Sequence, residues 1–175
     1  NQTKDTMATS KSNISPSEIN FQCGDAIQVC MAIEREGISF YEQAIKKARD
    51  PKVKDVFRRL GRDERDHSKA LQAKWKHLQP AVGKRSPTNE EVNRFIQSEV
   101  KGRVFDLESL KGPDMQTDLE AVEFGITCEK RSIEILGFLL EAERKIDVKA
   151  IFSHLLVEEK KHLSDLEALK AELSI

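Results

Sequence analysis

Two short motifs in the sequence each place a glutamate and a histidine three residues apart. They are "DERDH", which holds Glu64 and His67, and "EEKKH", which holds Glu159 and His162. On a helix this spacing brings both side chains of a motif to one side, where a carboxylate and an imidazole can bind a metal ion together. A single motif is weak evidence, because both residue types are common on solvent-exposed helix faces. The interpretation therefore depends on whether the chain supplies further ligands.

The two motifs belong to an internal repeat in which residues 53–67 align with residues 148–162. The aligned segments are "VKDVFRRLGRDERDH" and "VKAIFSHLLVEEKKH". The same offset places Glu34, in "MAIEREGISF", on Glu129, in "ITCEKRSIEI". Each half of the chain therefore contributes one glutamate followed, 30 residues later, by the glutamate of a Glu-x-x-His motif.

Every glutamate of this set interrupts a stripe of apolar residues with helical spacing. The four stripes are Ile27, Cys30, Glu34, Ile38, Tyr41 and Ile45; Val53, Phe57, Leu60, Glu64, His67, Leu71 and Leu78; Val122, Ile126, Glu129, Ile133, Leu136 and Leu140; and Val148, Phe152, Leu155, Glu159, His162, Leu166, Leu169 and Leu173. No lysine or arginine lies on these stripes beside the acids. Burying four uncompensated carboxylates would cost many kcal/mol, so the fold must neutralise them.

Two divalent cations would balance the four carboxylates and use two neutral imidazoles as further ligands. One glutamate from each of two helices, with Glu-x-x-His from each of two others, is the dinuclear carboxylate arrangement of iron and manganese helical bundles. Oxygen donors with imidazole suit iron or manganese, and zinc can also occupy such a site. The six predicted metal ligands are Glu34, Glu64, His67, Glu129, Glu159 and His162.

Four long helices are predicted to position these ligands, over residues 25–48, 52–78, 117–143 and 147–173. The turns within each pair are short, whereas residues 80–117 form a long connection that contains the amphipathic stretch "NEEVNRFIQSEVKGRVF". Two antiparallel helical hairpins joined by one long crossover describe an all-α, ferritin-like four-helix bundle. A single bundle domain is expected over residues 15–175, opened by the capping-box pattern "SPSE", after a mobile polar tail at residues 1–14.

Composition excludes several other functions for this chain of 175 residues. A formal net charge of −1 gives no reason to expect nucleic acid or an anionic membrane as a partner. No apolar run approaches the roughly 20 residues of a membrane span, and the N-terminus lacks the apolar core of a secretory signal. Cys23, Cys30 and Cys128 form no Cys-x-x-Cys pair, which favours reduced thiols in a cytoplasmic protein and excludes a zinc ribbon or a rubredoxin-type iron site.

On these motifs the chain resembles the rubrerythrin-like proteins of the ferritin-like superfamily. The resemblance lies in "AIEREGISFY" (32–41), "DERDH" (63–67), "CEKRSIE" (128–134) and "EEKKH" (158–162), and covers roughly residues 22–174. It implies a non-haem diiron centre that reduces hydrogen peroxide with electrons from a rubredoxin-type site. It also implies that Glu64 and Glu159 bridge the two metals, that Glu34 and Glu129 are terminal ligands, and that the chain forms a homodimer.

The chain departs from the pattern of these proteins at three points. The rubredoxin domain is missing, so electrons would come from a separate donor such as a rubredoxin-like protein. Ser132 stands where the family has an additional glutamate, three residues after Glu129, that takes part in a redox-linked shift of one iron. Tyr41, which is expected to donate a hydrogen bond to a ligand carboxylate, corresponds in the second half to Leu136, which leaves one such tyrosine instead of two.

Three functions are compatible with these residues. The first is a diiron oxidoreductase that reduces hydrogen peroxide, a small-molecule oxidant, by two electrons. The second is a ferroxidase or iron-handling protein that uses dioxygen. The third is a non-catalytic metal-binding bundle with a structural or sensor role. Neither His77 nor His154 has a carboxylate at ligand spacing on its own stripe, so both are predicted to be surface or rim residues.

Overall fold

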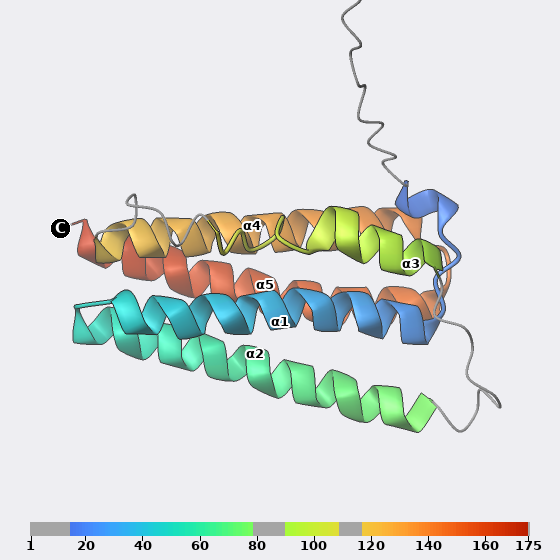
Figure 1. Cartoon of the computed structure of the whole chain (residues 1–175), viewed down its shortest axis with the longest axis horizontal. Helices are drawn as coiled ribbons and strands as arrows, with labels where there is room; N and C mark the ends of the chain where they lie inside the picture. Colours follow the sequence, from blue (N-terminus) through green and yellow to red (C-terminus); the bar gives the residue numbers. More distant parts are fainter. Residues whose placement is uncertain (1–14, 79–89, 109–116, 175) are drawn as a thin grey trace, which may run out of the picture.

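The computed structural model describes residues 15–78, 90–108 and 117–174. Its four long helices are α1 (Cys23–Lys47), α2 (Pro51–Leu78), α4 (Asp118–Ala142) and α5 (Ile146–Leu173). The helices α1 and α2 pack as one antiparallel hairpin and α4 and α5 as a second (Figure 1). The predicted all-α, ferritin-like four-helix bundle is therefore confirmed, and each predicted end of a long helix lies within two residues of the observed one.

Short polar side chains define where these helices begin. Thr117 and Glu120 form a reciprocal capping box at α4, with the Glu120 N–H donating to Thr117 Oγ1 at 3.2 Å and the Thr117 N–H donating to Glu120 Oε2 at 2.9 Å. At α2 the Oδ1 of Asp50 accepts the N–H of Lys52 at 2.7 Å. The "SPSE" signal opens only the three-residue 3₁₀-helix η1 (Pro16–Glu18). The predicted tail at residues 1–14 lies outside the described residues.

The apolar stripes meet in a core that has an aromatic cluster at each end. In one cluster Tyr41 and Phe57 have ring centroids 6.0 Å apart and both pack against Phe40. In the other, Phe21 and Phe152 stack edge to face at 5.6 Å. Because α2 and α5 run in opposite directions (Figure 1), the two clusters lie on either side of the Glu-x-x-His motifs. No helix in the described part of the chain is both long and apolar enough to cross a membrane.

The connection between the hairpins packs along the bundle and is partly helical. It contains α3 (Glu90–Phe95) and one turn of π-helix, η3 (Ile96–Val100). The chain then turns at Gly102, whose φ of 70° lies in the left-handed region that favours glycine. The carboxylate of Glu36 on α1 holds this turn, because it accepts the N–H of Gly102 at 2.6 Å and the N–H of Phe105 at 3.2 Å. The parts of the predicted connection at residues 79–89 and 109–116 lie outside the described residues.

Asp118 joins the two hairpins at one end of the bundle. Its carboxylate accepts the N–H of Asp50 at 2.6 Å and the N–H of Arg49 at 2.9 Å, in the turn between α1 and α2. Asp118→Ala is expected to lower the free energy of unfolding by about 1–2 kcal/mol, because it leaves these donors without their acceptor. Urea denaturation measures the loss. Asp118→Asn, which keeps an acceptor oxygen, should lose less, and an unaltered midpoint for the alanine variant would contradict the role.

Candidate metal centre

The six predicted ligand residues lie together in the middle of the bundle, and they come from all four long helices. Four carboxylates and one imidazole are almost completely buried: Glu34, Glu64, Glu129, Glu159 and His162 are each at most 1% exposed. His67 differs from the rest, because 21% of its side chain reaches the surface. The polar residues on the apolar stripes therefore face inward, as the helical spacing predicts.

These residues form two groups in which one candidate ligand atom from each member lies within 4.8 Å of those of the others. The His67 group consists of Glu34, Glu64 and His67, and the His162 group consists of Glu64, Glu129, Glu159 and His162. Glu64 belongs to both groups, which is the position that a bridging carboxylate needs. A bridging role for Glu159, which falls in one group, stays a prediction.

The two imidazoles lie nearly parallel, with ring centroids 5.7 Å apart and an angle of 19° between their planes. The Nδ1 atom of His67 lies 3.6 Å from Glu34 Oε1. The Nδ1 atom of His162 lies 3.4 Å from Glu64 Oε1 and 3.8 Å from Glu129 Oε1. Both rings therefore present Nδ1 to the carboxylates, and each Glu-x-x-His motif faces the other across the interface of α2 and α5.

Small residues make room for the carboxylates. A Cβ atom on Gly37 would lie 2.7 Å from Glu64 Oε1, so a larger residue at this position would displace the Glu64 carboxylate. In the repeat, the counterpart of Gly37 is Ser132, the position that the resemblance expects to be glutamate. Ser132 is fully buried beside Glu159, and its proximity lowers the pKa of that carboxyl against the larger effect of burial. Both positions thus lie next to a glutamate of a Glu-x-x-His motif.

Most polar atoms of this cluster lack the hydrogen-bond partners that buried groups normally have. Within the described part of the chain, neither oxygen of Glu34, Glu64 or Glu159 has a partner, and neither ring nitrogen of His162 has one. Buried polar groups without partners are rare in folded proteins, and each requires an explanation. Oxygen donors combined with imidazole nitrogens suit iron or manganese. The residues present therefore fit a pair of divalent cations, which would satisfy these atoms and balance the four carboxylates.

Burial without compensating charge perturbs the titration of the cluster. Desolvation, strengthened by the neighbouring carboxylates, raises the pKa values of Glu64 and Glu129 well above their usual range. Burial raises the pKa of Glu159 to about 7 and lowers the pKa of His162 to about 4. His162 is therefore a neutral imidazole at neutral pH, the form that binds metal. Divalent cations favour the ionised carboxylates and so reverse the shifts of the acids.

These shifts predict an unusual pH dependence for protein stripped of metal by a chelator. Because the pKa of Glu159 is about 7 in the fold, against an ordinary value of 4.5, the folded state holds a proton that the unfolded state releases between these pH values. The lowered pKa of His162 acts in the opposite direction, because the unfolded state binds a proton there that the folded state does not. The raised pKa values of Glu64 and Glu129 act in the same direction as that of Glu159. Three carboxyl groups outweigh one imidazole, so the free energy of unfolding should fall as the pH rises from about 4.5 to about 7. Urea denaturation at pH 5 and pH 7.5 measures the change, and equal stabilities would contradict it. Metal-loaded protein should lack this loss.

Tyr41 donates a hydrogen bond to the cluster. Its hydroxyl is completely buried and donates to Glu129 Oε1. Burial raises the pKa of Tyr41 well above its usual value, so the hydroxyl keeps its proton. Such a bond fixes the direction in which the other oxygen of the carboxylate points, which is how groups around a metal site orient its ligands.

Tyr41→Phe is expected to weaken metal binding by roughly 10- to 100-fold, the usual effect of losing a group that orients a ligand. Competition between the protein and a chelator for Co²⁺ measures the affinity. Thr127→Val is the matched control, since it removes an exposed hydroxyl from the same helix as Glu129. Equal affinities for Tyr41→Phe and the control would show that the hydrogen bond has no part in binding.

Two residues near the centre were not found by sequence reasoning. Gly37 is one turn from Glu34. Its repeat counterpart is Ser132, and a small residue at both positions is the sequence pattern that could have predicted its role. Glu158 lies beside a predicted ligand in "EEKKH", and its Oε2 is 3.4 Å from His67 Nε2. The predicted rim residues His77 and His154 are both exposed, as expected.

Comparison with known proteins agrees with this arrangement. The family model described as Rubrerythrin matches residues 25–170, a span that includes all six predicted ligand residues. Comparisons with curated proteins and with solved structures gave no match. The family match covers most of the chain, and it contains both Glu-x-x-His motifs and the glutamate that precedes each of them. This chain belongs to the rubrerythrin family, whose ferritin-like bundles hold a metal centre.

Proposed function

We propose that this protein is a non-haem diiron oxidoreductase that reduces hydrogen peroxide, with Glu34, Glu64, His67, Glu129, Glu159 and His162 as the iron ligands. One peroxide with two protons and two electrons gives two molecules of water. The observation that carries the proposal is the buried cluster of four carboxylates and two imidazoles, most of whose polar atoms have no partner in the described part of the protein. Family membership supports iron over manganese or zinc as the occupant.

When bound, a pair of ferrous ions supplies the two electrons that a peroxide needs. The protein supplies the ligand set, the shape and the electrostatics. Its four carboxylates match the charge of two divalent ions, and Tyr41 holds Glu129 in one orientation. The aromatic clusters on either side of the ligands exclude bulk water from the core, which strengthens the electrostatic interactions inside it.

The reaction needs a source of electrons, and we assign this part to a separate donor such as a rubredoxin-like protein. The sequence given contains no Cys-x-x-Cys pair that could form a rubredoxin-type site. Association of two chains through the bundle and a cytoplasmic location complete the proposal. All three cysteines are free thiols, which supports a reducing compartment.

A second candidate function is ferrous iron oxidation by dioxygen, and Ser132 is the residue that favours it. The resemblance expects a glutamate there, and a serine hydroxyl cannot replace a carboxylate as a ligand for a moving iron. A chain that cannot make this shift would retain a dinuclear centre while losing preference for peroxide.

Anaerobic loading with ferrous iron followed by stopped-flow mixing separates these functions. Saturation at two irons per chain with much faster oxidation by hydrogen peroxide than by dioxygen supports the peroxidase. Faster oxidation by dioxygen, with uptake continuing beyond two irons, supports iron handling instead. Ser132→Glu sharpens the test, because it should leave metal binding intact and raise the preference for peroxide only if position 132 sets that preference.

A further inference from the structure

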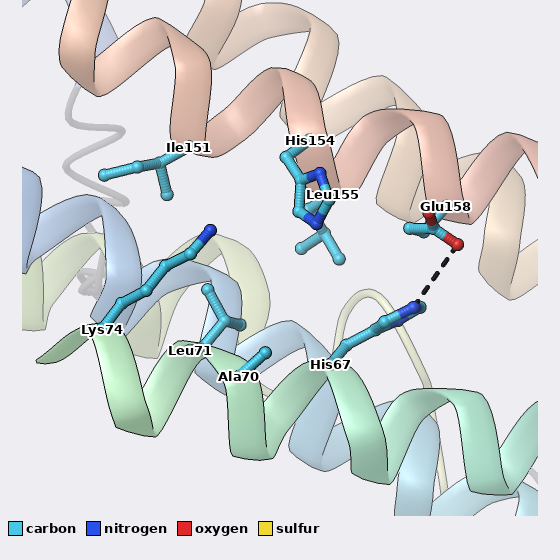
Figure 2. Close-up of a pocket in the computed structure, with 8 residues that line it drawn as sticks. All are labelled: His67, Ala70, Leu71, Lys74, Ile151, His154, Leu155 and Glu158. Atoms are coloured by element: carbon cyan, nitrogen blue, oxygen red, sulfur yellow. Dashed lines mark ion pairs between the residues drawn. The ribbon is translucent and has the colours of Figure 1, made fainter.

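His67 is the one member of the six-residue cluster that solvent reaches, and a cleft in the surface between α2 and α5 leads to it. Figure 2 shows the cleft, with His67, Ala70 and Lys74 on the α2 side and His154 and Glu158 on the α5 side. Its volume of about 30 Å³ has room for a water molecule or a single ion. His67 lines this cleft, and its Nε2 atom is directed to Glu158. Its Nδ1 atom is directed to Glu34 in the core.

The charges around the cleft differ between its two ends. At one end of the cleft, Glu158 Oε2 lies 3.4 Å from His67 Nε2 (Figure 2), and Glu158 is partly exposed. A carboxylate beside an imidazole is a pair of groups that a divalent cation can contact on its way inward. At the other end, Lys74 on α2 carries a positive charge. Lys161 also approaches Glu158, with its Nζ 3.9 Å from Oε2.

The internal repeat provides a second, equivalent surface, and there an ion pair joins the two helices. The repeat counterparts of Ala70 and His154 are Asp165 and Arg59. These two side chains form an ion pair across α5 and α2, with Arg59 Nη1 2.5 Å from Asp165 Oδ2. His162, the counterpart of His67, is completely buried. The surface beside His67, the open side, therefore has a small neutral residue and an imidazole. The repeat-related surface, the closed side, has a carboxylate and a guanidinium at the same two positions.

We propose that the α2–α5 cleft is the route by which divalent cations enter and leave the buried centre, passing Glu158 and reaching the His67 group first. This route rests on the proposed metal centre, and it specifies the side of the bundle from which the centre takes up its ions. The ion of the His67 group exchanges quickly through the cleft. The ion of the His162 group lies behind the Arg59–Asp165 ion pair and exchanges slowly, so the two ions are kinetically distinct.

Transplanting the closed arrangement onto the open side tests the route. The double variant Ala70→Asp with His154→Arg is compared with wild type in stopped-flow uptake of Co²⁺ by the full chain after chelator treatment, followed by visible absorption. Uptake should slow by about tenfold or more, a typical size for electrostatic and steric control of entry. Saturation should still be two ions per chain. Ala73→Asp with Ser153→Arg introduces the same charges at exposed neighbouring positions and should leave the rate unchanged.

The reciprocal variant opens the closed side. Arg59→His with Asp165→Ala should accelerate the slow phase of Co²⁺ release to a chelator, while the fast phase keeps its rate. Single charge changes add a further check, because Glu158→Gln should slow uptake and Lys74→Gln should speed it. Both differences should shrink at high ionic strength, which screens charges at the surface.

The outcomes distinguish the route from the centre itself. Binding of two Co²⁺ ions at rates that neither double variant alters would overturn the route and leave the metal centre standing. A wild-type chain that binds no Co²⁺ would overturn the proposed centre, and the route with it. Slower uptake in the first double variant and faster release in the second support the route.

Discussion

Replacement of Glu64 by glutamine is expected to abolish tight binding of two divalent ions per chain. Glu64 is the residue shared by the His67 group and the His162 group, so its loss removes a charged ligand from both. The same change should raise the stability of metal-free protein at neutral pH, because burial raises the pKa of Glu64 and so opposes the ionisation that the unfolded state undergoes freely. The amide has nearly the shape of the carboxyl group but no proton equilibrium that opposes folding.

A loss of metal binding combined with a gain in the stability of metal-free protein distinguishes a metal ligand from a structural residue. Isothermal titration with Co²⁺ gives the stoichiometry, and urea denaturation of chelator-treated protein gives the stability. Glu134→Gln, an exposed change on α4, should alter neither quantity. If Glu64→Gln still bound two ions tightly, the assignment of the shared ligand would be wrong.

Metal loading should produce the largest change in thermal stability. A ligand present at 1000 times its Kd stabilises the folded state by about 4 kcal/mol for each site. For a domain of this size, each kcal/mol raises the Tm by roughly 2–4 °C. Two ions should therefore raise the Tm by roughly 15–30 °C, and a chelator should reverse the change.

Calorimetry with and without a chelator measures this difference. The Tyr41→Phe variant provides a graded control, because weaker binding at the same free metal concentration should give a smaller rise in Tm. An equal Tm with and without the chelator would show that no ion binds in the core, whatever the arrangement of the carboxylates.

The sequence was sufficient to predict the bundle and the residues that meet at its centre, because both follow from helical spacing. Each long helix has apolar residues on one face, and a polar residue on that face must enter the core with it. The glutamates at positions 34 and 129 were identified because the repeat offset is the same for them as for the Glu-x-x-His motifs. Periodicity and internal repetition are properties of the sequence itself, so no tertiary information was needed.

The rest depends on the directions of individual side chains and on contacts between distant segments. The pairing of Glu158 with His67 joins two helices in different hairpins, and neither spacing nor composition distinguishes Glu158 from other surface glutamates. The attachment of Glu36 to the turn at Gly102 is of the same kind, because it needs the path of the crossover. The difference between the open and closed sides of the centre depends on the ion pair of Arg59 with Asp165, which joins residues of two different hairpins and has no signal in the sequence.

The internal repeat also has a consequence for the origin of the fold. Each hairpin carries one glutamate and one Glu-x-x-His motif, so two copies of a single hairpin, related by a two-fold axis, would bring together all six ligands. A short ancestral gene could thus have built the centre as a symmetric pair before duplication and fusion. Once both halves were encoded separately, selection no longer held them identical. The tyrosine of one half, the leucine of the other, and the exposure of His67 where His162 is buried record that divergence.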